Sequence, residues 1–194
     1  MRSRHLPPFR RRVLEPARGV VLELGIGSGL NLGFYPAAVE RLIGVEPSAP
    51  LLALARRAAE TAPFPVTLLQ ASAESLPLPD ASVDTVVTTW TLCSIPDVGR
   101  ALVEARRVLR PDGRLLFVEH GLAPEPGVQE WQRRLTPLWR RCSGGCHLDR
   151  PIAALIAEAG FRFERLDVGS MPGPRLVTYM TEGSARTHLG APGD

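Results

Sequence analysis

The sequence predicts an α/β fold: a doubly wound, mostly parallel sheet with helices on both faces. Residues 20–24 are almost wholly apolar, as in a strand buried on both faces, and glycines follow at positions 25, 27 and 29. Strand-like and helix-like segments then alternate four times between residues 20 and 120, the pattern of successive βαβ units. With 194 residues and 44% hydrophobic content the chain can bury a full core, so we expect one domain.

The predicted elements follow in order along the chain. Residues 1–18 form a leader rich in arginine and proline with a short helix at 9–15, and the domain itself is expected to span 19–182. A helix starting at Leu30 should receive the glycine loop and break at Pro36. Further runs predict strands at 41–46, 66–70, 84–89 and 114–119, helices at 49–62 and 101–109, and a turn at 110–113.

The C-terminal third departs from this repetition. Residues 127–141 carry Trp131, Leu135, Leu138 and Trp139 at helical spacing, interrupted at Pro137. Such a stripe is usual for core packing, but an insert at 124–148 would also lie over the edge of the sheet where open α/β folds bind ligands, so we predict a substrate lid. A helix at 152–159, strands at 161–168 and 175–181, and a frayed tail at 183–194 complete the prediction.

The glycine loop indicates the kind of ligand. Gly25, Gly27 and Gly29 remove every Cβ from one side of the turn, so the backbone can adopt positive φ and a ligand can lie against it. A dinucleotide fingerprint would need another glycine where Leu30 stands. Glu23 precedes the loop, and a carboxylate there disfavours a pyrophosphate and favours a cationic ligand. The other interpretation is a glycine-rich turn with an incidental acid.

A second acid, Glu46, ends the predicted strand at 41–46. A carboxylate at the end of the second strand of a βαβ unit can accept two hydrogen bonds from the ribose diol of an adenosine-bearing cofactor. Glu46 could also complement the dipole of the helix that begins near Ser48. The two roles are compatible, and the pairing of Glu46 with Glu23 favours the ligand role.

These motifs resemble those of class I S-adenosylmethionine-dependent methyltransferases. The order acid-x-G-x-G-x-G at 23–29 resembles their first motif, and L-R-P-D-G at 109–113 resembles their turn into the fifth strand. The segments L-C-S at 92–94, E-H at 119–120 and G-C-H-L at 145–148 resemble a subgroup that includes the animal thiol S-methyltransferases of the methyltransferase-like 7 group. The resemblance spans residues 18–181 and implies a seven-stranded sheet ending in an antiparallel hairpin.

The resemblance also implies the ligands and the residues that hold them. The cofactor would be S-adenosylmethionine, leaving as S-adenosylhomocysteine, and the partner a small acceptor such as a thiol or a lipid- or quinone-like molecule. Ser72 stands where the family commonly has Asp, so contact with the adenine edge would come from Ser72, Glu74 or backbone. The implied cofactor-binding residues are Glu23, Gly25, Ile26, Gly27, Gly29, Asn31, Glu46, Pro47, Ser72, Ala73, Glu74 and Thr89.

Two histidines are the predicted proton acceptors for an incoming thiol or hydroxyl. His120 follows the fifth strand at the ligand edge and His147 lies in the lid region, and an imidazole titrates near neutrality. Either could instead hydrogen-bond to local backbone. Methyl transfer is an in-line displacement that needs no covalent enzyme intermediate, so Cys93 is interpreted as a small buried apolar residue.

Cysteine usage and charge restrict the other partners. Cys142, Cys146 and His147 suggest zinc, but two cysteines and one histidine make a poor ligand set, so the sequence predicts no metal. Three cysteines without a secretory signal favour reduced thiols in the cytoplasm. The net charge of +3 comes from arginines spread along the chain, so we predict no nucleic-acid partner. No apolar run spans a bilayer, the basic leader is compatible with peripheral membrane contact, and a monomer or homodimer is expected.

Two other functions stay open on the sequence. A nicotinamide-dependent oxidoreductase would share the fold and Glu46, but Glu23 and Leu30 disfavour its phosphate loop. A non-catalytic adenosyl-ligand-binding protein would keep the cofactor motifs, and Ser72 leaves room for it.

Overall fold

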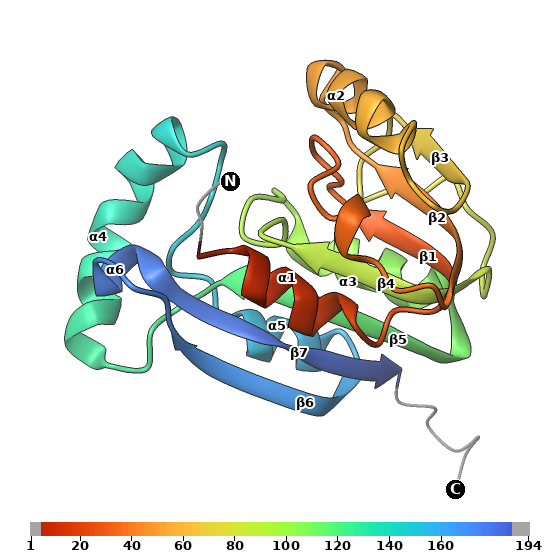
Figure 1. The fold of residues 1–194 in the computed structure, drawn as a ribbon. Helices are drawn as coiled ribbons and strands as arrows, with labels where there is room; N and C mark the ends of the chain where they lie inside the picture. Colours follow the sequence, from red (N-terminus) through yellow and green to blue (C-terminus); the bar gives the residue numbers. More distant parts are fainter. Residues whose placement is uncertain (1–4, 188–194) are drawn as a thin grey trace, which may run out of the picture.

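The sheet has seven strands in the order β3-β2-β1-β4-β5-β7-β6 (Figure 1). The computed structural model describes residues 5–187. The first five strands pair in parallel, and β7 is antiparallel to both β5 and β6, which confirms the predicted fold class. The strands are β1 (Gly19–Leu24), β2 (Val39–Val45), β3 (Val66–Leu69), β4 (Val83–Thr89), β5 (Leu109–His120), β6 (Phe161–Ser170) and β7 (Tyr179–Thr187).

Helices cover both faces of this sheet (Figure 1). On one face, α1 and α2 pack with the short 3-10 helix η1, and on the other α3 and α5 pack together. The longest helix, α4, and the short α6 contact each other at the end of the sheet where β5 and β7 meet. Their bounds are α1 (Pro7–Leu14), η1 (Leu32–Phe34), α2 (Ala49–Ala59), α3 (Val98–Val108), α4 (Pro126–Cys142), α5 (Ile152–Glu158) and α6 (Arg175–Thr178).

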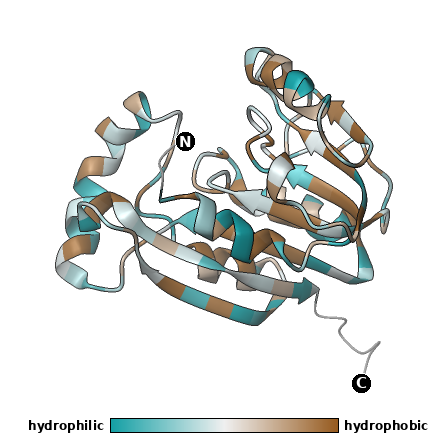
Figure 2. Cartoon of the chain, in the orientation of Figure 1, coloured by the Kyte–Doolittle hydropathy of each residue, from teal (hydrophilic) through white to brown (hydrophobic). Residues whose placement is uncertain are grey.

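Burial explains the strand pattern. β1 and β4 are buried along almost their whole length, as expected of central parallel strands with helices on both sides. In the outer strand β6, hydrophobic and hydrophilic residues alternate instead (Figure 2). At the start of α3 the Asp97 side chain accepts a hydrogen bond from the Arg100 backbone N–H at 2.9 Å, which caps the helix.

The α-helix expected to start at Leu30 is wrong, whereas the break expected at Pro36 is confirmed. After the glycine loop the chain forms only the three-residue η1, and Tyr35 is extended, with φ −69° and ψ 138°. Pro36 explains this, because a residue that precedes proline is pushed out of the helical region. The tight turn also allows the Tyr35 hydroxyl to reach Glu23, 2.8 Å away.

Four further expectations also need correction. The strand placed at 175–181 begins at Tyr179, because α6 follows Pro174, and β7 then runs on to Thr187. Of the expected tail, 183–187 therefore belong to the sheet, and 188–194 lie outside the described residues. The interruption expected at Pro137 is absent, since α4 continues through it. The turn expected at 110–113 belongs to β5, with a register irregularity opposite Val83 and Thr85.

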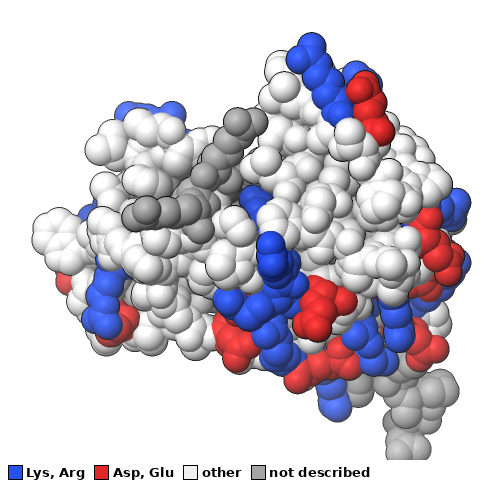
Figure 3. All heavy atoms as spheres, viewed as in Figure 1, with Lys and Arg blue, Asp and Glu red and all other residues white. Residues whose placement is uncertain are grey.

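Charged side chains of both signs lie together on the face seen in Figure 3, over α1 and the strands below it. One such pair is Arg12 of α1 and Glu182 of β7, whose atoms lie 3.0 Å apart. On the same view the region around α4 is mostly uncharged. Between residues 5 and 187, no helix combines the length and the apolar character that crossing a bilayer requires.

Candidate active site

A cavity of about 570 Å³ opens at the carboxyl ends of β1, β2 and β4. This is the point where the strand order reverses, and open α/β sheets bind ligands there. Most of the predicted cofactor residues line it: Glu23, Gly25, Ile26, Gly27, Glu46, Pro47, Ser72, Ala73 and Thr89. Gly29, Asn31 and Glu74 do not line it.

The glycines of the loop have different tasks. Gly25 and Gly27 adopt φ of +65° and +58°, and both line the cavity. A Cβ on Gly25 would come within 2.4 Å of the Thr91 methyl carbon, whereas a Cβ on Gly27 would meet nothing nearer than 3.9 Å. Gly29 instead packs on α2, where its Cβ would lie 2.8 Å from that of Ala58. Gly27 therefore opens the loop towards the cavity, and Gly29 fixes the loop to the helix.

Glu23 is the centre of a buried polar network. Its carboxylate accepts hydrogen bonds from the Asn31 side-chain amide at 2.7 Å and the Tyr35 hydroxyl at 2.8 Å. Asn31 also donates to the Thr89 hydroxyl and accepts from Arg10. Burial raises the pKa of Glu23 to about 7, against the lowering effect of the hydrogen bonds from Tyr35 and Asn31 and of the charge of Arg10. Asn31 thus supports Glu23 from behind the cavity wall.

Glu46 accepts two backbone hydrogen bonds. One carboxylate oxygen accepts from the Gly27 N–H at 3.1 Å, and the other from the Ser48 N–H at 2.9 Å. The side chain therefore ties the glycine loop to the start of α2 and also lines the cavity. Each oxygen keeps further acceptor capacity for a ligand hydroxyl.

Ser72 and Glu74 divide the role that the sequence gave them jointly. Ser72 lines the cavity and donates from its hydroxyl to Glu74 at 3.0 Å. The Glu74 carboxylate also accepts from the Asp97 backbone N–H at 2.7 Å. Glu74 therefore holds the loop against the start of α3 and is directed away from the cavity lining, which leaves Ser72 and Ala73 as the lining residues of this loop.

Several lining residues were not among the predicted cofactor-binding residues. Arg10 of α1 reaches the cavity, and its guanidinium carbon lies 4.8 Å from the centre of the Trp90 ring. Trp90 follows β4 with φ of +52°, unusual for a bulky residue, and donates its indole N–H to the Met180 sulfur at 3.3 Å. The position of Trp90 directly after a predicted strand was the available signal. Nothing local distinguishes Arg10 from the other arginines of the leader.

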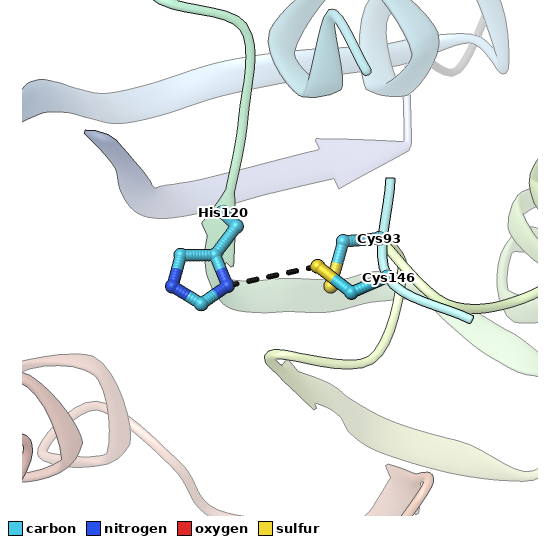
Figure 4. Close-up of side chains that lie close together, drawn as sticks. All are labelled: Cys93, His120 and Cys146. Carbon is cyan, nitrogen blue, oxygen red and sulfur yellow. Dashed lines mark hydrogen bonds between the residues drawn. The ribbon is translucent and has the colours of Figure 1, made fainter. Parts of the chain in front are cut away.

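The two predicted catalytic histidines lie beside the cavity and do not line it. His120 ends β5, and its Nδ1 lies 3.9 Å from the Cys146 sulfur (Figure 4). His147 donates its backbone N–H to the Cys93 carbonyl at 2.8 Å, and its Nδ1 lies 3.9 Å from an Asp149 oxygen. Burial and the charges of Arg150 and Arg140 lower the pKa of His147. Two lining residues adjoin these segments: Ser94 follows Cys93, whose carbonyl accepts from His147, and Gly144 precedes Cys146, and we call this part of the lining the Ser94 wall.

Cys93 and Cys146, buried and far apart in the chain, meet at this place. The hydrogen bond from the Cys93 thiol lowers the pKa of Cys146, and His120 and the Trp139 indole act in the same direction. That hydrogen bond, together with burial, raises the pKa of Cys93. Cys142, which the sequence analysis grouped with Cys146, is exposed at the end of α4.

Glu119 positions the loop that carries Cys93. Its buried carboxylate accepts hydrogen bonds from the Thr88 hydroxyl, the Thr91 N–H at 3.1 Å and the Cys93 N–H at 3.4 Å. Burial raises the pKa of Glu119 despite these hydrogen bonds. The pair Glu119-His120 thus places one side chain under the loop and the other beside the cysteines.

Comparisons with known proteins agree with this geometry. A family model described as a methyltransferase domain matches residues 22–117. The thiol S-methyltransferase TMT1B of Rattus norvegicus is 37% identical over 152 residues, which cover 76% of this chain and 62% of that protein. The demethylmenaquinone methyltransferase of Thermus thermophilus is 36% identical over 124 residues, covering 60% and 56%. This chain therefore spans only part of the length of its curated relatives.

A solved structure shows the same fold. The YcgJ protein of Bacillus subtilis superposes with a TM-score of 0.75, covering 97% of this chain and 100% of that one. Its identity is 19%, so the likeness concerns the arrangement of the sheet and helices alone.

Proposed function

This chain belongs to the class I S-adenosylmethionine-dependent methyltransferases, and from that premise we propose that it transfers a methyl group to the sulfur of a small thiol. The observation that carries the reaction type is the buried Glu23 beside a glycine loop that is open to a cavity. The thiol is supported by the relative that is named for that acceptor.

The lining residues fit the proposed cofactor. Glu23 and Arg10 place one negative and one positive charge at the same end of the cavity, which suits the ammonium and carboxylate of an amino-acid group. Glu46 has acceptor capacity left for ribose hydroxyls, and Ser72 and Ala73 would lie along the adenine. When bound, the cofactor supplies an electrophilic methyl group on a sulfonium sulfur.

The chain's own residues would align the acceptor and receive its proton. Trp90, Ser94 and Gly144 line the side of the cavity that leads to the histidines, and they would exclude water from the encounter. His120 is the first proposed proton acceptor, because it ends β5 beside the Ser94 wall, and His147 is the second.

A quinol-like acceptor is the second candidate, because the demethylmenaquinone methyltransferase is similar over a shorter stretch.

The two other functions that the sequence left open, a nicotinamide-dependent oxidoreductase and a non-catalytic binder, stay testable alternatives. Glu23 disfavours a nicotinamide dinucleotide, whose phosphates would meet a buried carboxylate. A non-catalytic binder would keep the cavity and lack turnover.

The test is a transfer assay with an isotopically labelled methyl group. The full chain is incubated with labelled S-adenosylmethionine and, in parallel, an alkyl thiol, the matching alcohol, a phenol, a demethylated quinol and a lipid amine. We expect label on the thiol sulfur and none on the alcohol. Label on the quinol would support the second candidate, and calorimetric binding of S-adenosylmethionine without any transfer would support the binder. Tighter binding of NADH than of S-adenosylmethionine would overturn the proposal.

A variant tests the proposed base. His120→Ala should leave the affinity for S-adenosylmethionine nearly unchanged while turnover falls at least about 100-fold, the usual size of a lost proton-transfer group. Unchanged turnover would remove His120 from the mechanism and leave His147 as the candidate, to be tested by the same substitution.

A further inference from the structure

Three side chains from separate parts of the sequence converge behind the Ser94 wall. Cys93 comes from the loop after β4, His120 from the end of β5 and Cys146 from the loop after α4 (Figure 4). The ligand atoms they offer, two sulfurs and one imidazole nitrogen, all lie within 4.8 Å of one another. Both cysteines are buried, and His120 is half-buried.

This arrangement has the composition of a soft metal site. Thiolate sulfur and imidazole nitrogen are the ligands that zinc prefers, with bonds of about 2.3 Å and about 2.0 Å, so ligand atoms of a tetrahedral site lie roughly 3.5 to 4 Å apart. The observed 3.9 Å between His120 Nδ1 and Cys146 Sγ is within that range. Three protein ligands would also leave a fourth position open, as in catalytic zinc sites.

The surroundings hold these ligands in place and suit a bound thiolate. The Cys93 backbone is fixed on both sides, because Glu119 accepts from its N–H and His147 donates to its carbonyl at 2.8 Å. The buried Trp139 indole N–H makes no hydrogen bond of normal geometry, although it lies close enough to the Cys146 sulfur to lower the pKa of that thiol, and Trp139 packs against the cysteine pair. A metal-bound thiolate sulfur would carry negative charge, and the indole N–H could donate a hydrogen bond to it.

The local charge is compatible with two thiolates. Arg150 is buried beside them and donates to the carbonyl oxygens of Leu92 and Pro96, on either side of the Cys93 loop. Its positive charge interacts with both cysteines. The apolar side chains of Leu148 and Leu135 pack in one cluster with the two cysteines, which limits the access of water.

We propose that Cys93, Cys146 and His120 form a binding site for a soft divalent metal ion, with Zn²⁺ as the first candidate. The ligand set differs from the one that the sequence analysis judged and dismissed, because Cys142 lies exposed on α4 and His147 points to Asp149. Cys93 and His120 complete the ligand set with Cys146, and because both are far from Cys146 in the sequence, residue spacing does not indicate this set. The ion would lie directly behind Ser94, whose hydroxyl is 3.6 Å from the Cys93 sulfur and which lines the cavity.

The site has a consequence for the reaction, which rests on the proposed thiol transfer. A thiol that takes the open position gives its proton to solvent and its sulfur lone pair to the metal, and so is held as a thiolate near pH 7. In the transfer its sulfur forms a bond to the methyl carbon while the carbon–sulfonium bond breaks, and that electron pair stays on the departing thioether sulfur. With the ion bound, His120 would be its ligand in place of the proton acceptor proposed above, and the metal-bound thiol would need no protein base.

The test uses Co²⁺ as a spectroscopic probe on the full chain. The protein is treated with a reductant and a chelator, and both reagents are then removed under anaerobic conditions. The reduced, metal-free protein is titrated with Co²⁺ alone. We expect sulfur-to-cobalt charge-transfer absorption and the visible bands of a tetrahedral site, saturating at an equimolar ratio and displaced by Zn²⁺. Cys146→Ser and Cys93→Ser should weaken binding by more than about 100-fold, since even outer-shell changes cost 10–100-fold. Cys142→Ser, the matched control, should bind as the original chain does.

The outcomes separate this inference from the proposed function. Absence of the sulfur-to-cobalt bands in the reduced original chain overturns the metal site whether or not the variants fold, and so do equal bands in Cys146→Ser. Coupling of Cys93 and Cys146 into a disulfide without metal binding would mark a redox pair and overturn it as well. A cobalt-loaded chain that shows the bands but transfers no methyl group keeps the site and refutes the function. Thiol methylation at full rate by a chelator-treated chain that shows no bands with Co²⁺ keeps the function and refutes the site.

Discussion

The two ends of the proposed reaction site differ in how completely their polar groups are satisfied. On the cofactor side, Glu23 has hydrogen bonds from Asn31 and Tyr35, and Glu46 has two from backbone N–H groups. On the cysteine side, the contact between His120 and Cys146 is a long 3.9 Å, and the Trp139 N–H makes no hydrogen bond of normal geometry.

This difference shows which side is already organised. A fully bonded network fixes side chains in one arrangement before a ligand arrives, because each buried polar atom would lose a partner if it moved. A weakly bonded group of soft ligands keeps capacity for another atom. Substitutions that change shape or charge should therefore have large effects on the cofactor side. The cysteine side should respond more to an added metal ion.

The largest effect is expected where shape is fixed most tightly, at Gly25. Gly25→Ala places a Cβ within 2.4 Å of the Thr91 methyl at φ +65°, so backbone strain and overpacking add. We expect a loss of about 3 kcal/mol in the free energy of unfolding and no measurable binding of S-adenosylmethionine. Gly33→Ala is the control, since a Cβ there has no neighbour within 4 Å. Urea unfolding and calorimetry check both, and equal behaviour of the two variants would contradict this account of the loop.

The sequence predicts the cofactor side better than the cysteine side, because the motifs of the cofactor side are local in the sequence. Glu23 and Glu46 were found because each stands at the end of a recognisable strand, and parallel strands bring their carboxyl ends to one edge. The fold class was confirmed for the same reason, since each strand carries its own apolar pattern. The helix predicted to start at Leu30 is a short 3-10 turn instead, because Pro36 keeps Tyr35 extended and the Tyr35 hydroxyl donates to Glu23, a contact that no local pattern shows.

The arrangement of the cysteine side could not be predicted from local sequence patterns. Cys142 and His147 lie next to Cys146 in the sequence and attracted the zinc interpretation, yet Cys142 is exposed and His147 faces Asp149. The neighbours of Cys146 in space, Cys93 and His120, come from the ends of two other strands. Arg10 is similar, because its importance comes from α1 packing over β5, which no short motif encodes. Only the folded chain shows which distant residues meet.

The buried charge of Glu23 should appear in the pH dependence of stability. Its pKa is raised by burial from 4.5 to about 7, so between these values the folded state binds more protons than the unfolded state. The stability that this group contributes is therefore complete below pH 4.5 and is lost as the pH rises through 7. Relative to Glu23→Gln, the ligand-free original chain should lose about 2 to 3 kcal/mol between pH 4.5 and 8. Urea unfolding at both pH values measures this, and a constant difference would contradict the buried carboxylate.

The same titration should appear in ligand affinity with the opposite sign. A cationic ligand favours the ionised carboxylate, so the affinity of the original chain for S-adenosylmethionine should rise between pH 6 and 8 relative to that of Glu23→Gln, reaching about ten-fold tighter binding at pH 8. Using the ratio of the two chains removes the ligand's own titration. Glu40→Gln, on the exposed side of β2, is the control. Calorimetry would refute the charge argument if the ratio stayed flat.

The smallest effect is expected from removing one hydrogen bond on the organised side. Tyr35→Phe deletes the hydroxyl that donates to Glu23 at 2.8 Å and leaves the ring packed edge-on against Phe64, with centroids 5.9 Å apart. The loss should be about 1 to 2 kcal/mol, the cost of leaving a buried acceptor with one donor fewer. It should grow as the pH rises through 7, because the ionised carboxylate needs the donor more than the neutral acid does. Tyr179→Phe, at the start of β7, serves as the matched control and should cost less at every pH. A loss at Tyr35 that is independent of pH would mean that its hydroxyl serves packing alone, and the cofactor side would then be organised by shape and not by the charge of Glu23.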